Sequence, residues 1–223
     1  MLARPAPAAT AGADTPPAFE RVVEALDECF RDDRWMERRG RIEEAVADLS
    51  RDHCMLRYLV EELARQKRWP RIAGAQSFIL YLDRNYYIRA NLWYPKPNLV
   101  SGEEKYRKYL SIGECHNHTY SFFTAAVLGD GYESTFFTAD VKGKALEPGD
   151  PVDLRERRPV RLAPGDVLFV ERDRDFHIQH WPTDFTVTVN VVPIAAGDTS
   201  PRQYIVDADR GVVLHAINAG MAH

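Results

Sequence analysis

Residues 112–120 read Ile-Gly-Glu-Cys-His-Asn-His-Thr-Tyr, and the interpretation of the whole chain starts from this stretch. It places two histidines, His116 and His118, one residue apart. In a β-strand, residues i and i+2 point to the same face, so a strand here would hold the two imidazoles side by side, with Cα atoms about 6–7 Å apart. Imidazole suits iron, zinc, copper and nickel alike. The spacing therefore predicts a metal site without naming the metal.

A third ligand is predicted about 60 residues further on, in the stretch Phe-His-Ile-Gln-His-Trp of residues 176–181. A barrel would bring this later strand next to the strand that carries the first two histidines. His177 and His180 point to opposite faces of such a strand, so only one of them can reach the same cavity. We predict His177 as the ligand, with His180 as a less favoured alternative.

The chain after Trp69-Pro70 has the sequence pattern of a β protein, because short runs rich in β-branched and aromatic residues alternate with residues typical of turns. No long helix fits between consecutive runs, which argues against a parallel α/β sheet. Many short antiparallel strands indicate a sandwich or barrel, and a jelly roll is one candidate. The expected strands are 77–82, 86–93, 109–128, 133–139, 160–170, 175–181, 185–192, 203–206 and 212–216.

Residues 18–69 are expected to form a helical segment that packs on the barrel. Apolar residues recur there at helical spacing in three successive stripes, with charged residues between them. Residues 1–17 are rich in Ala and Pro and are expected to be a disordered tail. The expected division is thus a tail (1–17), helices (18–69) and a β-barrel domain (70–223). The stripes begin with Phe19, Val22 and Leu26, continue with Ile42, Val46 and Leu49, and end with Leu56, Leu59 and Leu63.

Composition limits the classes of function. The chain has 223 residues and a formal net charge of −4, so nothing favours binding to nucleic acid. No apolar run approaches the ~18 residues that a membrane span needs. Three widely spaced cysteines are no disulfide framework and fit a reducing compartment, so we expect a cytoplasmic protein. A homodimer is possible, and a small molecule is the expected partner.

The histidine pattern resembles the two motifs of the cupin superfamily, a fold of jelly-roll β-barrels. Gly113, His116 and His118 match part of the first motif, and Pro164-Gly165-Asp166 with His177 match the second loosely. The first motif normally adds a glutamate four or five residues after its second histidine. Phe122 and Phe123 occupy those positions here, and Glu133 is only a less favoured alternative ligand.

A cupin with three histidines and no glutamate is similar to the thiol dioxygenases, such as cysteine dioxygenase. This resemblance implies Fe(II), O₂ and a small carboxylated, amino-acid-like substrate. It also implies that Arg89, in the stretch Tyr87-Ile88-Arg89, holds the substrate carboxylate. In some of these enzymes a cysteine is crosslinked to an active-site tyrosine. This chain lacks that cysteine, and the nearby position in its sequence is Phe123, so the resemblance does not imply that a thiol is oxidised.

The remaining candidates follow from strand alternation. Tyr87, Asn91 and Trp93 share the face of Arg89 and would form a pocket wall, although an exposed edge strand would fit the same pattern. Tyr120 would lie next to the metal as a catalytic group or a core aromatic, and Gln179 would orient a ligand or the substrate. Zn, Ni, Mn and Cu are the alternatives to iron at such a site. Zn, Ni or Mn acting as a Lewis acid would indicate a non-redox isomerase, lyase or hydrolase. A ligand-binding barrel without turnover is the third class.

Overall fold

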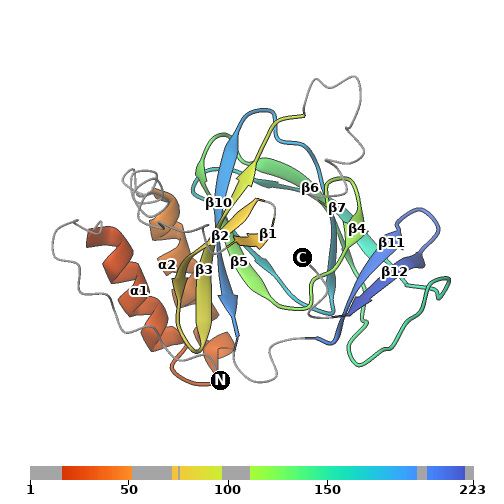
Figure 1. Cartoon of the computed structure of the whole chain (residues 1–223), viewed down its shortest axis with the longest axis horizontal. Coiled ribbons are helices and arrows are strands. Elements are labelled where there is room, and N and C mark those ends of the chain that lie inside the picture. The colour runs from red at the N-terminus through yellow and green to blue at the C-terminus, as the bar shows by residue number, and fades with distance from the viewer. Residues whose placement is uncertain (1–16, 52–71, 75, 97–110, 195–199, 219–223) are drawn as a thin grey trace.

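Two antiparallel six-stranded sheets form the described part of the chain together with the N-terminal helices (Figure 1). The computed structural model describes residues 17–51, 72–74, 76–96, 111–194 and 200–218. Sheet A contains, in spatial order, β1 (Ile72–Gly74), β2 (Ser77–Leu82), β3 (Tyr86–Trp93), β10 (Thr186–Pro193), β5 (Phe122–Leu128) and β8 (Val167–Val170). Sheet B contains β12 (Val212–Asn218), β11 (Arg202–Asp207), β4 (Cys115–His116), β9 (Asp175–Gln179), β6 (Tyr132–Thr138) and β7 (Arg155–Leu162).

The strand order is that of a jelly roll. Four strands of sheet A in the order β3-β10-β5-β8 face four strands of sheet B in the order β4-β9-β6-β7. The chain passes from one sheet to the other at almost every connection, and only β6 and β7 are consecutive neighbours within these eight strands. This double-sheet arrangement is one of the ways in which antiparallel proteins protect their strand edges. It confirms the predicted fold class, mainly β with a helical N-terminal segment and a cupin-type barrel.

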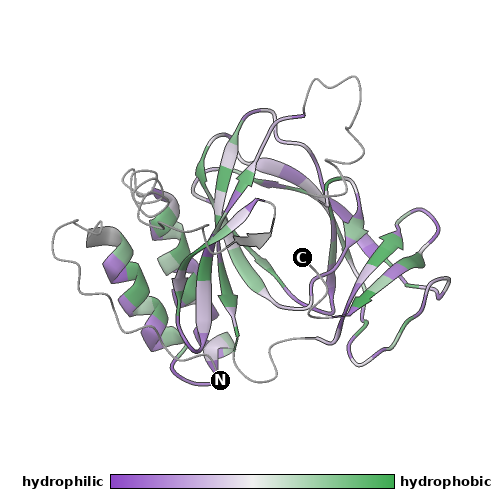
Figure 2. Cartoon of the chain, in the orientation of Figure 1, coloured by the Kyte–Doolittle hydropathy of each residue, from purple (hydrophilic) through white to green (hydrophobic). Residues whose placement is uncertain are grey.

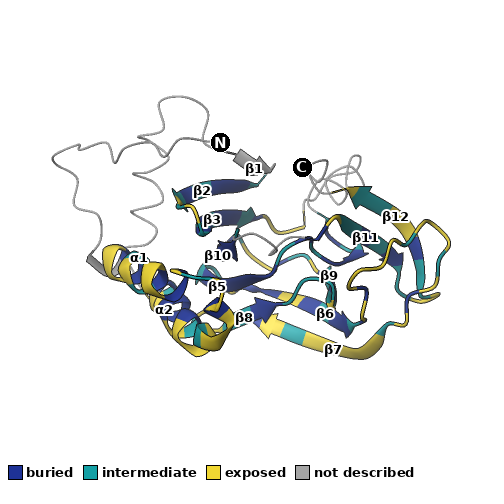
Figure 3. Cartoon of the chain, turned by 90° about the horizontal axis from the view of Figure 1, so that it is seen from below, coloured by how far each residue is buried: buried dark blue, intermediate teal, exposed yellow. Residues whose placement is uncertain are grey.

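The helices cover the outer face of sheet A (Figures 1 and 2). Pro17–Cys29 forms α1, Trp35–Arg38 forms a 3₁₀ helix, and Arg39–Arg51 forms α2. Their apolar stripes, including Leu26 and Ile42, join one buried cluster with the outward side chains of the sheet, while their charged faces are exposed (Figure 3). The predicted third helix and residues 1–16 of the predicted tail lie outside the described residues, and Pro17, the last residue of that tail, begins α1. No helix of the described residues is long and apolar enough to cross a membrane.

Strand β3 shows how sheet A separates two environments. Tyr86, Ile88 and Ala90 are buried in the cluster shared with the helices. Since side chains alternate along a strand, Tyr87 and Arg89 point the other way, into the barrel. The Tyr86 hydroxyl donates to the Asp27 carboxylate of α1 over 2.8 Å, and burial raises the pKa of this tyrosine. Sheet A is therefore a single layer with the helical core on one side and the barrel interior on the other.

Two of the expected strands were wrong in extent. The stretch expected at 109–128 contains the separate strands β4 and β5, which belong to different sheets. The stretch expected as one strand at 160–170 contains the end of β7, at Leu162, and the start of β8, at Val167. These two strands also belong to different sheets. In both cases the chain turns a barrel corner between two apolar runs, and alternation of hydropathy alone does not mark such a corner.

Gly131 is expected to be intolerant of any side chain. Its φ is +76°, and a Cβ atom there would lie 1.7 Å from the Leu162 carbonyl oxygen. Gly143 has a similar φ of +70° with no atom within 4 Å of the added carbon. Alanine should cost about 1–2 kcal/mol at Gly143, from the backbone conformation alone, and clearly more at Gly131, where β7 must also move. Urea unfolding of both variants checks this, and equal losses would contradict it.

Candidate metal centre

Three imidazoles meet inside the barrel. Strand β4 pairs with β9 so that His116 lies directly opposite His177, and His118 follows two residues after His116. The ring centroids of the three histidines lie 4.6, 5.0 and 5.1 Å apart. One ligand atom from each ring lies within 4.8 Å of those of the other two. His116 and His177 are buried and His118 is half-buried, so the cluster faces the interior of the barrel.

The two histidines of the first motif do not share a strand, contrary to the sequence-based expectation. Strand β4 ends at His116, and His118 lies in an irregular segment before β5. Asn117 holds this segment in place, because its Oδ1 accepts a 2.7 Å hydrogen bond from the backbone N–H of Tyr204 in β11. The Thr119 carbonyl accepts a second bond from the backbone N–H of Ser200, at 2.6 Å. The bend in the chain, rather than strand alternation, therefore brings His118 to the cluster.

The arrangement fits a bound divalent cation. Among the described residues, the His116 Nδ1 atom has the Glu114 carbonyl as its hydrogen-bond partner, at 2.9 Å. Because a carbonyl only accepts, this nitrogen carries the proton and Nε2 keeps a free lone pair. The Nε2 atoms of His118 and His177 lie 3.0 Å apart. Two nitrogens about 2.1 Å from one ion and about 90° apart are separated by about 3.0 Å. Three neutral nitrogen donors on one side leave the other positions of an octahedral ion open.

The environment keeps these imidazoles neutral. Burial lowers the pKa of His116, and the hydrogen bond to the Glu114 carbonyl offsets part of this effect. Burial also holds the pKa of His118 well below its ordinary value, with added repulsion from His116, His177 and Arg89. The pKa of His177 is lowered in the same way, by burial and then by His116. A neutral imidazole is the form that binds a metal ion, so protons compete weakly at pH 7.

These pKa shifts predict that the chelator-treated protein loses stability in acid. The folded state resists protonation of the three histidines, whereas the unfolded chain protonates them near their ordinary pKa of 6.5. Their contribution is therefore fully present above pH 6.5 and is lost as the pH falls below it, by up to about 1.4 kcal/mol per histidine and pH unit. Urea unfolding at pH 7.5 and 5.5 measures this loss. His180→Asn should lose as much as the wild type, and a triple Asn replacement of the cluster much less.

Arg89 lies in the barrel wall beside the cluster. Strand β3 is flanked by β2 and β10, which excludes the alternative of an exposed edge strand. The guanidinium lies 5.5 Å from the ring centroid of Tyr120, which in turn lies 5.6 Å from the His118 ring. No carboxylate of the described residues forms an ion pair with Arg89, and its Nε atom is buried without a partner. A cation in this position is a ready receptor for an anionic ligand.

The other predicted wall residues differ in whether their polar atoms already form hydrogen bonds within the protein. Asn91 and Trp93 both donate hydrogen bonds to the Thr188 hydroxyl, at 3.3 and 3.0 Å, so their polar atoms serve the wall itself. Tyr87 packs with the apolar residues around the cluster, and burial, followed by the effect of Tyr120, raises its pKa to about 12. Of the four, Arg89 is therefore the residue best placed to bind substrate.

Gln179, His180 and Glu133 occupy different sides of sheet B. Gln179 shares the inner face of β9 with His177 and is buried. His180 is exposed, and its Nε2 atom lies 2.9 Å from the hydroxyl of Thr135. Glu133 is exposed on the same side of β6 as Thr135. The structure thus does not bring either of the two less favoured ligands to the three-imidazole cluster.

Comparison with known proteins gives structural similarity only. No protein-family model matches the chain, and no curated protein matches it. The DMSP lyase DddQ from Ruegeria pomeroyi DSS-3 is 13% identical, with a TM-score of 0.40 over 94% of this chain and 100% of that one. Hydroquinone 1,2-dioxygenase from Sphingomonas sp. TTNP3 is 9% identical, with a TM-score of 0.37 over 56% and 69%. A double-stranded β-helix protein from Klebsiella pneumoniae is 8% identical, with a TM-score of 0.31 over 62% and 91%. The fold assignment rests on the strand order given above.

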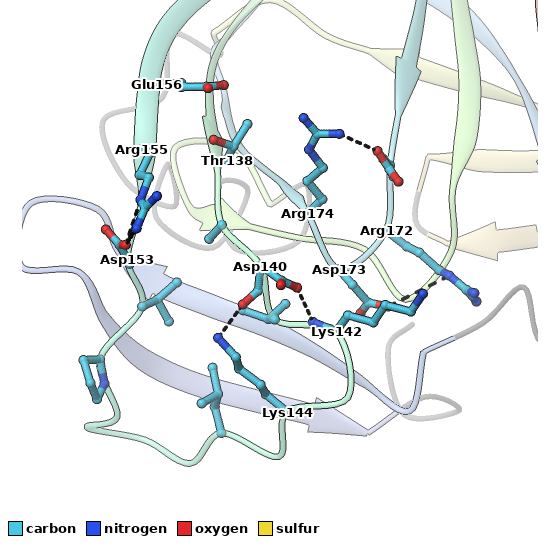
Figure 4. Close-up of a pocket in the computed structure, with 16 residues that line it drawn as sticks. Thr138, Asp140, Lys142, Lys144, Asp153, Arg155, Glu156, Arg172, Asp173 and Arg174 are labelled. Atoms are coloured by element: carbon cyan, nitrogen blue, oxygen red, sulfur yellow. Dashed lines mark hydrogen bonds and ion pairs between the residues drawn. The ribbon is translucent and has the colours of Figure 1, made fainter.

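A separate pocket of about 560 Å³ lies where the ends of β6 and β9 meet the connection that leads to β7 (Figure 4). None of the three clustered histidines lines it. Its charged side chains largely pair with each other, as Arg155 does with Asp153 and Arg174 with Glu171. Such paired charges at a solvent-exposed surface contribute little energy and leave no unbalanced charge for a ligand. We therefore place the candidate active site at the three histidines and not at this pocket.

Proposed function

We propose that the chain is a metal-dependent cupin enzyme, an Fe(II) oxygenase that acts on a small carboxylated, amino-acid-like substrate with O₂. The observation that carries this proposal is the pairing of three neutral imidazoles inside the barrel with one arginine that has a buried Nε atom and no carboxylate partner among the described residues. The imidazoles supply donors without negative charge, so a bound divalent ion would keep its full charge. The arginine supplies the site with a fixed positive charge for the substrate.

His116, His118 and His177 would hold the ion through one ring nitrogen each. Ferrous iron in such a facial site supplies open positions for substrate and O₂. The protein supplies the rest: Arg89 binds the carboxylate, and the apolar side chains of Phe122, Phe136 and Val192 exclude water around the cluster. The ring of Tyr120 lies between Arg89 and His118 and orients both.

Metal analysis of anaerobically purified protein tests the proposal. We expect about one iron per chain, and oxygen consumption on addition of a small amino or hydroxy acid. Tightly bound zinc with no iron would contradict the oxygenase and favour a lyase, isomerase or hydrolase. A chain that binds no divalent metal would contradict any metal-dependent enzyme and leave a binding protein as the remaining class.

A further inference from the structure

The side chains inside the barrel form successive rows across the two sheets. Near the histidines, one row of sheet B contains His116, His177 and Phe136. Tyr87 and Val192 lie at the same level in sheet A, since they share an apolar cluster with Phe136. Further along the strands, four residues from Phe136 in β6 and six residues from Tyr87 in β3, Tyr132 and Trp93 form a second apolar cluster that again joins both sheets. The rows between these two clusters must therefore face each other across the barrel.

These intervening rows are polar. In sheet A, Arg89 on β3 pairs in register with Asn190 on β10, which pairs in turn with Thr124 on β5. In sheet B, Gln179 on β9 pairs with Ser134 on β6. All of them lie on the inner face, because the adjacent residues Ile88, Val189 and Ile178 pack in the clusters on the outer faces. Glu133, next to Ser134, is exposed on the outer face of sheet B. We call Arg89, Asn190, Ser134 and Gln179 the polar belt.

Each member of the polar belt has a buried polar atom with no hydrogen-bond partner in the part of the chain that the structure describes. These atoms are the Arg89 Nε, the Asn190 Oδ1, the Ser134 Oγ and the Gln179 Nε2. The next row of sheet A is different, because Asn91 and Trp93 both bond to Thr188 there. An unpaired buried polar atom costs about 1–3 kcal/mol, so four of them in one layer beside the metal-binding residues require an explanation. A polar ligand, bound in that layer, supplies it.

The chemistry of the polar belt defines that ligand. The Arg89 Nε and the Gln179 Nε2 are donors, the Asn190 Oδ1 is an acceptor, and the Ser134 hydroxyl is both. A carboxylate satisfies the donors but gives nothing to Asn190, which needs an O–H or N–H group. Directly opposite residues of neighbouring antiparallel strands lie about 5 Å apart, so a carboxylate on Arg89 brings the next carbons of the ligand to Asn190.

We propose that the polar belt determines specificity and selects small acids that carry a hydroxyl or amino group on the second or third carbon. This inference rests on the proposed function in one respect, that Arg89 receives the carboxylate. Arg89 fixes the acid group, Asn190 accepts from the hydroxyl or amino group, and Gln179 with Ser134 completes the layer from the opposite sheet. An unsubstituted acid of the same size leaves Asn190 unpaired and binds more weakly.

Calorimetric titration of the full-length chain tests the proposal, with propionate compared with lactate, 3-hydroxypropionate, alanine and β-alanine. At least one substituted acid should bind about tenfold or more tighter than propionate. Because a hydroxyl or amino group also chelates metals, each titration is repeated on chelator-treated protein, where the preference should persist. An absence of iron would refute the oxygenase proposal while leaving this comparison readable.

Variants locate the preference within the polar belt. Asn190→Leu should bring the affinity for the preferred acid close to that for propionate. Gln179→Leu removes a donor to the carboxylate, which both acids carry, and should weaken the binding of both. Thr188→Ser, in the row that is already paired, keeps its hydroxyl and should retain the preference. The proposal is overturned if no substituted acid binds tighter than propionate to the wild type. It is equally overturned if the preference survives in an Asn190→Leu protein whose circular dichroism shows that it is folded.

Discussion

His177→Ala is expected to reduce bound metal from about one ion per chain to a trace. Removal of one of three donors leaves an ion held by two imidazoles, and even groups that only orient metal ligands contribute 10–100-fold to affinity. The loss should therefore exceed about 100-fold. Competition with a chromophoric chelator measures it, and elemental analysis of the purified variant confirms the stoichiometry.

His180→Ala is the matched control, because it removes a histidine three residues away whose side chain contacts Thr135 on the other face of the sheet. It should bind metal like the wild type. Equal metal content in His177→Ala and the wild type would refute the assignment of the third ligand. A loss in His180→Ala with retention in His177→Ala would exchange their roles.

Arg89→Met is expected to weaken binding of the preferred acid by about 100-fold while the metal content stays the same. The guanidinium offers a carboxylate charge-assisted hydrogen bonds in a buried site, and loss of one partner of such a pair costs about 2–5 kcal/mol. The same variant should unfold at higher urea concentration than the wild type. It replaces a half-buried charge, whose Nε atom is buried and which lacks a carboxylate partner among the described residues, by an apolar side chain of similar length.

A variant that binds the acid more weakly but unfolds at higher urea concentration has lost a binding residue, whereas loss of a structural residue lowers the stability. Titration calorimetry measures the binding, and urea unfolding measures the stability. Arg161→Met on β7, an exposed position, should change neither. A destabilised Arg89→Met protein that still binds the acid normally would show that Arg89 supports the barrel and not the substrate.

The sequence predicted the strands best where one face meets apolar core and the other meets the site. The bounds of β2 and β3 agree with the expectation, because alternation along Tyr86–Trp93 is uninterrupted. The prediction of strand bounds was wrong at the two barrel corners, between β4 and β5 and between β7 and β8, because apolar residues continue on both sides of each bend. The local spacing His-x-His named two members of the cluster, although they come together by a bend and not by a shared strand.

Other parts of the site depend on contacts that local patterns do not contain. The bond between Asn117 and Tyr204 joins residues 87 apart in the chain, so no local pattern marks the role of the residue between the two histidines. The polar belt, in contrast, has a local signal in the sequence. In β10 the polar residues Thr186, Thr188 and Asn190 alternate with valines, which marks a strand with a polar inner face rather than a fully apolar one.

Sheet A, one strand layer thick, also has a consequence for how this protein can change. Val189 and Val191 face the helices, while Asn190 between them faces the barrel interior. Repacking of the helical core would shift the same backbone that sets the distance between the polar belt and the histidines. Selection for a new substrate could therefore act through substitutions in α1 and α2 that never touch the ligand, with the helices serving as the adjustable support of the site.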